Sequence, residues 1–334
     1  MIIFWLSFLH YYTRFTGFLV GLYLFKRKIK LTYVDIIVIA CLILLHFLHF
    51  FDGKSWLNIA IDLRFWWGWL LFYFILKDKP ISAHLIGNAL VALSFLVLLE
   101  TVLINTILDP WMLPNFPEND GTVGEYSFVV NYQRPYAFGA SATVGSCLVV
   151  ALMALSRVRG WRLWLSIFVV FVFVSGTGIF ALGLLLLLQY RGFIIKYMIP
   201  VFLIILSFYY LLPELFNIVI FELSRKAGFE YINILFWIKL EQVYQGFAAL
   251  NNFELFFGDR DGGRGGDFGG LLFILANGLL GALALLLMTF SRMNKENTVP
   301  LILLLITSLH YPVIFFVPGQ MVFGLLLGMK NKNT

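Results

Sequence analysis

Long runs of apolar residues alternate along the chain with short polar connections. The runs are apolar on every side, as in residues 184–188, instead of alternating with a period of two, so we expect helices and not barrel strands. A helix needs about 20 residues to cross a hydrocarbon layer roughly 30 Å thick. The pattern predicts about eleven membrane-spanning helices, at residues 3–25, 34–51, 57–76, 83–108, 136–155, 161–174, 179–189, 198–212, 268–290, 300–311 and 313–329.

Composition supports a membrane protein. Of the 334 residues, 61% are hydrophobic and 13% are charged, whereas soluble domains carry roughly 25% charged residues. The net charge of +6 comes from Lys and Arg residues that lie in short clusters at the ends of apolar blocks. Clusters in these positions indicate how the chain is oriented in the membrane and do not indicate nucleic-acid binding. Cys41 and Cys147 lie inside apolar blocks, so we expect packing residues and no disulfide framework or metal site.

The connections between the apolar blocks alternate in charge. If eleven spans are counted, the basic clusters at 26–30, 77–79, 157–159, 191–196, 292–295 and 330–332 fall on one side of the membrane. Loops rich in Lys and Arg remain in the cytoplasm. We therefore expect one membrane domain over residues 1–334, with the N-terminus outside and the C-terminus in the cytoplasm. The first apolar block is too long for a cleaved signal and is expected to stay in the membrane.

Two longer polar segments then fall on the outer face. Residues 109–135 contain several prolines and are expected to be irregular. Residues 213–267 form a large outer loop that needs its own structure, and the helical spacing of apolar residues within 222–250 predicts an amphipathic helix on the bundle or the membrane surface. The expected fold class is an all-α polytopic membrane helix bundle with a large, partly helical outer loop.

Two of the predicted spans, 161–174 and 179–189, are shorter than a full crossing and are separated by the turn Ser175-Gly176-Thr177-Gly178. Short or glycine-interrupted spans are tolerated where they line a protected cavity. This pair of spans predicts a water-filled pocket on the outer side.

The most concentrated polar signal runs from Gly258 to Asp267, directly before the span that begins at residue 268. Glycine at this density lets the backbone approach a ligand closely. The run is not a P-loop, because no Lys-Ser or Lys-Thr follows at the required spacing. Asp259-Arg260-Asp261 resembles the Asp-x-Asp metal motif of nucleotide-sugar transferases, but nucleotide sugars are cytoplasmic and this segment is expected outside. The alternative is a solvated loop with incidental charges.

Arginine recurs where the two outer loops meet the membrane. Arg134 precedes the span at 136–155, and Arg260 and Arg264 precede the span at 268–290. A single arginine at a membrane boundary is commonly a snorkelling anchor, but a guanidinium also presents a planar fork of donors for two phosphate oxygens. We expect these three arginines to bind a diphosphate, with Tyr132 and Gln133 lining the same cavity.

Charged residues inside apolar blocks are costly in lipid and usually face the bundle interior. Here they are Arg14, Asp62, Arg64 and Glu100. Asp62 and Arg64 are expected either to pair with other helices or to line the cavity. His46 and His49 share a helix face, but no third metal ligand is near them in sequence, so a metal is not expected there. His310 is a candidate for proton transfer.

Four short elements of the second half, spread over about residues 131–327, form an ordered pattern. They are the arginine and small-residue helix start at 132–139, the serine-containing turn at 175–178, the element Leu-Phe-Phe-Gly at 255–258, and a polar residue followed by a helix at 267–281. This order resembles the O-antigen polymerases, the Wzy family, within the superfamily that includes the O-antigen ligases. Asp267 stands where ligases usually carry histidine, which favours polymerase, and the family's arginine-tryptophan element is only partly present, at Trp237.

The resemblance implies a metal-independent, inverting glycosyltransferase without cofactors. It would polymerise undecaprenyl-diphosphate-linked oligosaccharide repeat units of O-antigen or a related surface polysaccharide on the outer face of the bacterial cytoplasmic membrane. Its partners would be the lipid-linked oligosaccharides, membrane lipid and a chain-length regulator protein, with no nucleic acid. Asp267 is then expected to orient or deprotonate the acceptor hydroxyl, with His310 as the substitute base.

Three other functions fit parts of the sequence. An O-antigen ligase would transfer the finished chain to another acceptor, such as lipid A core. A polysaccharide or lipid transporter or flippase is expected to show inverted repeats and polar residues at mid-membrane on several spans. A structural membrane protein would need no polar site.

Overall fold

The computed structural model describes residues 2–10, 21–23, 29–79, 82–107, 134–135, 141–193, 196, 239–259 and 268–329. These residues form helices and no strand, so the all-α fold is confirmed for this part of the chain. The helices are α1 (Ile2–Phe8), α4 (Tyr33–Phe51), α5 (Trp56–Leu76), α6 (Ala83–Thr106), α7 (Ala142–Ser156), α8 (Trp161–Val172), α9 (Gly176–Gln189), α10 (Arg191–Phe193), α13 (Lys239–Ala248), α14 (Asn252–Phe257), α15 (Gly269–Arg292), α16 (Thr298–His310), the 3-10 helix η4 (Val313–Phe315) and α17 (Val317–Gly328).

Short polar side chains mark where several of these helices begin. Thr32 caps α4 and forms a reciprocal capping box with Asp35. Ser141 accepts a hydrogen bond from a backbone N–H in the first turn of α7, and Ser175 does the same for α9. Asn251 caps α14. Such caps satisfy N–H groups that have no partner within the helix, so each apolar run starts at a defined residue.

Four helices, α4, α5, α6 and α15, are long and apolar enough to cross a membrane. Five shorter apolar helices, of 12 to 15 residues, lie among them: α7, α8, α9, α16 and α17. These nine helices match predicted blocks, and the chain is a helical membrane protein. The block at 198–212 lies outside the described residues and the first block is described only in part, so the count of eleven and the outside position of the N-terminus stay predictions.

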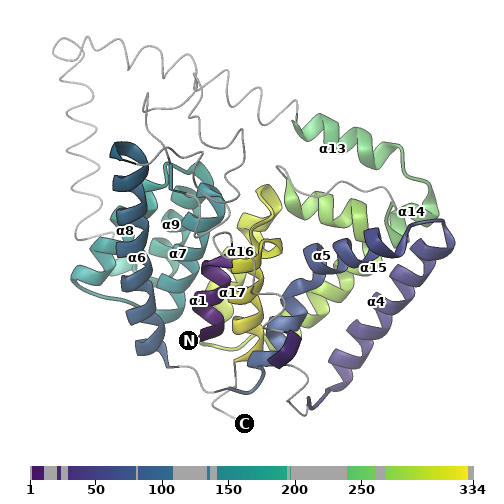
Figure 1. Cartoon of the computed structure of the whole chain (residues 1–334), viewed down its shortest axis with the longest axis horizontal. Helices are drawn as coiled ribbons and strands as arrows, with labels where there is room; N and C mark the ends of the chain where they lie inside the picture. Colours follow the sequence, from purple (N-terminus) through teal and green to yellow (C-terminus); the bar gives the residue numbers. More distant parts are fainter. Residues whose placement is uncertain are drawn as a thin grey trace.

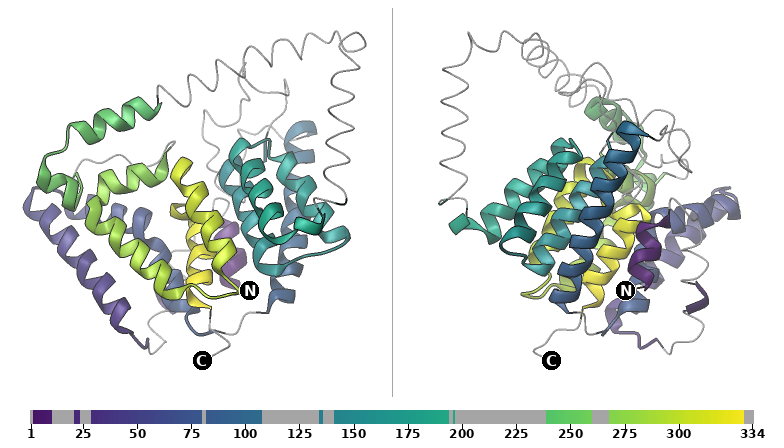
Figure 2. Two further views of the ribbon diagram at one scale, coloured as in Figure 1. Left: turned by 180° about the vertical axis from the view of Figure 1, so that it is seen from behind. Right: turned by 60° about the vertical axis from the view of Figure 1, so that its left-hand side comes forward.

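The helices form one bundle, shown in Figure 1 and from two further sides in Figure 2. The helix α17 packs along α5 near the centre, α4 packs against α15 on one flank, and α6 to α9 pack together on the other, where α7 and α9 contact α16. Nearly all residues of α7 and α17 are buried. These two helices can be short because protein surrounds them instead of lipid.

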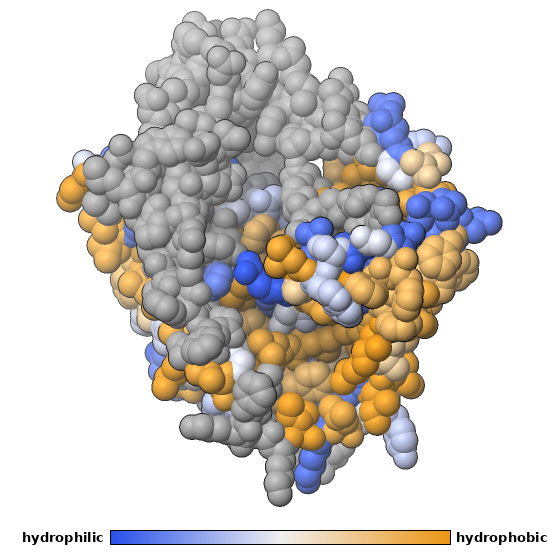
Figure 3. All heavy atoms as spheres, turned by 45° about the vertical axis from the view of Figure 1, so that its right-hand side comes forward, coloured by the Kyte–Doolittle hydropathy of each residue, from blue (hydrophilic) through white to orange (hydrophobic). Residues whose placement is uncertain are grey.

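Aromatic side chains fill the centre of the bundle. The largest fully buried ones are Trp66, Trp69, Tyr73, Phe8, Phe173, Phe273, Phe315 and Phe323. On the outside, Figure 3 shows apolar residues over the flank of the bundle and hydrophilic residues above and below them. Ile43 and Phe47 of α4 and Leu283 of α15 are among the exposed apolar residues of these long helices. An apolar surface of this kind is what a helix bundle presents to lipid.

Basic connections meet at one end of the bundle, which we call the basic end. Lys77 Nζ donates to the carbonyl of Lys30 at 2.6 Å, and Arg157 Nη2 donates to the carbonyl of Lys295 at 3.4 Å. Arg292 Nη2 also donates to Asp35 at 3.1 Å, so residues 77–79, 157–159 and 292–295 meet at one end of the described bundle, which lies at the bottom of Figure 1. The assignment of this end to the cytoplasm stays a prediction.

The two predicted outer loops are described only in part, namely residues 134–135 of the first and 239–259 of the second. The helix α13 covers the end of the predicted amphipathic segment. Its apolar residues Leu240, Val243 and Phe247 pack against Phe268 and Leu275 at the start of α15. The described part of the amphipathic helix therefore lies on the bundle, at the end opposite the basic end (Figure 1).

Candidate functional site

The end opposite the basic end brings together three elements that are distant in sequence. His310 is the last residue of α16, and its Nδ1 lies 3.0 Å from Oγ1 of Thr177 in the Ser-Gly-Thr-Gly turn. The backbone N–H of Phe268 donates to the carbonyl of His310, and the two rings meet edge to face with centroids 5.6 Å apart. His310 thus contacts both the turn and the residue that follows the glycine-rich run.

The predicted turn at 175–178 forms the N-terminus of α9, where Ser175 is the cap residue and residues 176–178 are helical. Ser175 is buried, and its Oγ accepts a hydrogen bond from the N–H of Gly178 at 3.2 Å and donates to Oγ1 of Thr143 at 3.3 Å. The hydroxyl groups of Ser175 and Thr143 therefore fix the first turn of α9, from which Thr177 reaches His310. A side chain held in this way keeps one orientation, as binding and catalytic groups require.

The helix α15 is interrupted at Gly278, whose φ is 63° and ψ is −174°. Asn277, just before the break, is buried; its Oδ1 accepts a hydrogen bond from Nε1 of Trp67 at 2.8 Å. Its Nδ2 donates to the carbonyl of Phe273 at 3.1 Å. An interrupted helix at membrane depth is stable only where protein groups replace the lost backbone hydrogen bonds.

Residues 256–259, which we call the docked segment, fill this break. The N–H of Asp259 donates to the carbonyl of Leu275 at 2.7 Å. A Cβ on Gly278 would overlap the carbonyl of Phe256, and one on Gly258 would overlap the backbone of Ala276. Both glycines have positive φ, which L side chains adopt at a cost. The entry of the glycine-rich run is therefore held against the broken helix, and its exit at Phe268 is held by His310.

Most of the predicted diphosphate site lies outside the described residues, namely Tyr132, Gln133, Arg260, Arg264 and Asp267. Of the predicted arginines near that site, Arg134 is described. It is partly buried, and its Nε is buried and has no hydrogen-bond partner among the described residues. A buried guanidinium nitrogen without a partner is costly unless a ligand or another group satisfies it.

The two charged residues of the third apolar block, Asp62 and Arg64, lie in different surroundings on α5. Asp62 forms a buried ion pair with Lys54 from the turn between α4 and α5, at 2.5 Å, as the structural interpretation expected. Arg64 is exposed, and its carbonyl accepts a hydrogen bond from Gln320 at 2.8 Å. Its role in lining a cavity stays a prediction. Glu100 is buried on α6, and Arg14 lies outside the described residues.

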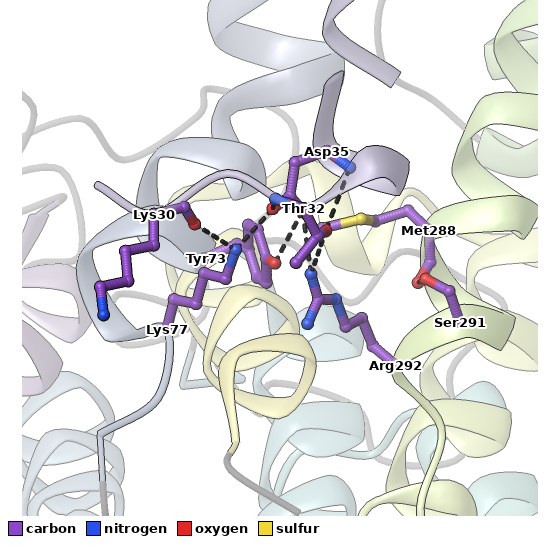
Figure 4. Close-up of polar contacts among 8 residues, drawn as sticks. All are labelled: Lys30, Thr32, Asp35, Tyr73, Lys77, Met288, Ser291 and Arg292. Carbon is purple, nitrogen blue, oxygen red and sulfur yellow. Dashed lines mark hydrogen bonds and ion pairs between the residues drawn. The ribbon is translucent and has the colours of Figure 1, made fainter. Parts of the chain in front are cut away.

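An ionic cluster at the basic end was missed by sequence reasoning (Figure 4). The buried carboxylate of Asp35 accepts hydrogen bonds from Lys77 Nζ at 2.5 Å, Tyr73 Oη at 2.8 Å and Arg292 Nη2 at 3.1 Å. The cluster ties α4, α5 and α15 together. The capping pattern of Thr32 and Asp35 was visible in the sequence, but nothing there placed Lys77 and Arg292 beside it.

Among the described residues, no group of three or more His, Cys, Asp or Glu side chains is placed to hold a metal ion. Cys147 is buried and Cys41 is half-buried, and both are free thiols. Comparison of the chain with models of protein families, with curated proteins and with solved structures finds no match.

Proposed function

We propose that this protein is a membrane glycosyltransferase that polymerises undecaprenyl-diphosphate-linked oligosaccharide repeat units of O-antigen or a related surface polysaccharide. The observation that carries the proposal is the convergence at His310. The serine-containing turn, the residue that follows the glycine-rich run and a candidate proton-transfer group meet at one end of the bundle. That end lies opposite the basic end, which we propose to be cytoplasmic, so the site would face outward.

In the proposed reaction, a hydroxyl oxygen of the acceptor sugar attacks the anomeric carbon of the donor sugar. A new glycosidic bond forms, the bond to the diphosphate oxygen breaks with inversion, and undecaprenyl diphosphate leaves. Arg134, Arg260 and Arg264 are proposed to bind the diphosphate. Their charges stabilise the transition state more than the ground state, because negative charge grows on the leaving group.

The acceptor proton passes to Asp267 or to His310 in this proposal. Thr177 supports a role for His310 because it fixes the imidazole through Nδ1. When Nδ1 carries the hydrogen and donates it to Oγ1 of Thr177, Nε2 is the basic nitrogen. Histidine is a stronger base than an unperturbed carboxylate, so it suits the removal of a proton near neutral pH.

Substitutions at position 310 test this assignment. His310→Gln retains an amide that can bond to Thr177 but cannot accept the proton, so polymerisation should fall by about a hundred-fold or more. Thr177→Val removes only the orienting hydroxyl and should cost less. The control is His84→Ala, which replaces an exposed histidine at the start of α6. Full polymer ladders from well-expressed His310→Gln protein would exclude His310 as the base.

The arginine substitutions test the diphosphate site. Arg134→Ala should lower polymerisation by about a hundred-fold, and Arg134→Lys should already be damaging because an ammonium keeps the charge but loses the planar fork. Asp267→Asn should slow transfer while leaving donor binding largely intact. The assay is the length distribution of polymer on a gel, normalised to protein in the membrane. Ladders of normal length from Arg134→Ala and Arg264→Ala would refute the diphosphate site.

The glycan that accumulates in cells lacking the protein separates the alternatives. Single repeat units on undecaprenyl diphosphate support the polymerase. Completed polymer on undecaprenyl diphosphate would instead support the ligase, because assembly would then have proceeded without this chain. Repeat units trapped on the cytoplasmic face would support a flippase.

A further inference from the structure

His49 connects the end of α4 to the docked segment, although the two are about two hundred residues apart in sequence. Its Nε2 lies 2.9 Å from the carbonyl oxygen of Phe257 and 3.3 Å from that of Gly258. Carbonyl oxygens only accept hydrogen bonds, so Nε2 carries the hydrogen and donates it. The imidazole therefore bonds to two successive carbonyls at the point where the chain enters the glycine-rich run.

The docked segment is held on its other side by α15. The N–H of Asp259 bonds to Leu275, and Gly258 lies against the backbone of Ala276. The docked segment is thus bonded both to His49 of α4 and to the break in α15. Because Asp259 and Phe268 are both fixed near the first half of α15, the two ends of the intervening run have defined positions.

His49 is itself rigidly placed. It is 3% exposed, and its carbonyl accepts a hydrogen bond from the N–H of Lys54 at 3.0 Å. Lys54 in turn forms the buried ion pair with Asp62 of α5. The imidazole therefore projects from the last turn of α4, and the residues that follow this turn are tied to α5 through Lys54, which is the support a positioning group needs.

His46 lies one turn earlier on the same helix and provides a contrast. Its ring is 6.0 Å from that of His49, and it is also buried. Neither of its ring nitrogens has a hydrogen-bond partner among the described residues. Of the two rings, only that of His49 bonds to the docked segment among the described contacts.

We propose that His49 is a positioning residue, which fixes the entry of the glycine-rich run against the break in α15 and so prepares this outer segment for the lipid-linked donor. The identity of the substrate in this proposal rests on the proposed function. The position of His49 against the docked segment rests on the observed hydrogen bonds. A segment held in place before binding loses little freedom when the ligand arrives, so its affinity for the ligand is higher.

Thiol labelling tests the geometry in the purified full chain in detergent. A cysteine replaces half-buried Asp259 in a background with Cys41→Ser and Cys147→Ala, and its reaction with a maleimide is timed. His49→Ala should accelerate labelling by about five- to tenfold, because two carbonyls lose their donor. His49→Gln places an amide nitrogen near the former Nε2 and should restore slow labelling. The matched control His46→Ala opens a similar cavity and should leave the rate unchanged.

Kinetics with lipid-linked repeat units test the consequence for the substrate. His49→Ala should raise the KM for the donor by about five- to tenfold with little change in kcat, because donor binding must then order the segment. A purely structural defect would reduce the amount of active protein and lower the apparent kcat at constant KM. If His49→Ala protein does not fold, His49→Leu fills the space without a donor and replaces it in both measurements.

Equal labelling rates for His49→Ala and His46→Ala would overturn the positioning role, as would fast labelling of His49→Gln. An unchanged KM beside a lowered kcat would do the same. If the unsubstituted chain forms no polymer, the proposed function fails, while the labelling rates still decide whether His49 holds the segment.

Discussion

Neutralising Asp35 should strongly destabilise the bundle. Its side chain is fully buried and accepts hydrogen bonds from Lys77, Tyr73 and Arg292, and the backbone N–H of Thr32 donates to it at 2.7 Å. In Asp35→Asn the shape is retained, but Lys77, whose side chain is 5% exposed, loses its counter-charge. Removing one partner of a buried ion pair costs about 3 to 5 kcal/mol.

The melting temperature of the purified protein in detergent measures this effect. A loss of that size should lower it by about 4 to 7 °C in a chain of this length. The control Asp78→Asn removes the same charge at the basic end from an exposed residue with φ 60°, a conformation that asparagine tolerates. The double variant Asp35→Asn, Lys77→Gln should recover part of the loss, because no unpaired ammonium remains. Melting temperatures of Asp35→Asn and Asp78→Asn within about 2 °C would refute the reasoning.

Three further predictions address the break in α15, the topology and the metal. Gly278→Ala should lower the free energy of unfolding by well over 1 kcal/mol, because φ is 63° and the new methyl group meets the docked segment. The control Gly183→Ala, with open space around it, should be neutral or stabilising, and melting temperatures compare the two variants. A cysteine at exposed Asn251 should react with a membrane-impermeant thiol reagent in intact spheroplasts, and labelling only after lysis would reverse the orientation. Polymerisation should survive EDTA, because Arg260 competes with a cation for Asp259 and Asp261, and rescue of lost activity by magnesium or manganese would restore the Asp-x-Asp interpretation.

Much of the helical architecture could be predicted from the apolar runs. The ends of α5, α6 and α16 fall within a few residues of the predicted bounds, because runs bounded by charges and prolines leave little choice of where a helix ends. The break in α15 could not be predicted, since Gly278 in an apolar run is also compatible with a continuous helix. It follows from the docked segment, which supplies a partner for the carbonyl of Leu275.

The candidate site was predictable in its residue types but not in its contacts. The turn at 175–178 was selected because it separates two short spans, and His310 because an imidazole can transfer protons. Their hydrogen bond depends on how α9 packs against α16. His49 shows the same limit. Its spacing from His46 drew attention to a metal, whereas the actual partners of its ring are backbone carbonyls, which leave no residue-specific trace in the sequence.

The bond between Thr177 and His310 also makes the site sensitive to the thickness of the bilayer. It joins α9 to α16, helices of 14 and 13 residues that are each about 20 Å long, whereas α4, α5 and α15 have 19 to 24 residues. A thicker or thinner membrane tilts long and short helices by different amounts. The carbonyl of His310 is also bonded to Phe268 at the start of the long helix α15, so a difference in tilt between α15 and α16 would move the imidazole relative to Thr177. A shift of about 1 Å would break a hydrogen bond of 3.0 Å, so the acyl chain length of the surrounding lipid should set how well the imidazole is aimed.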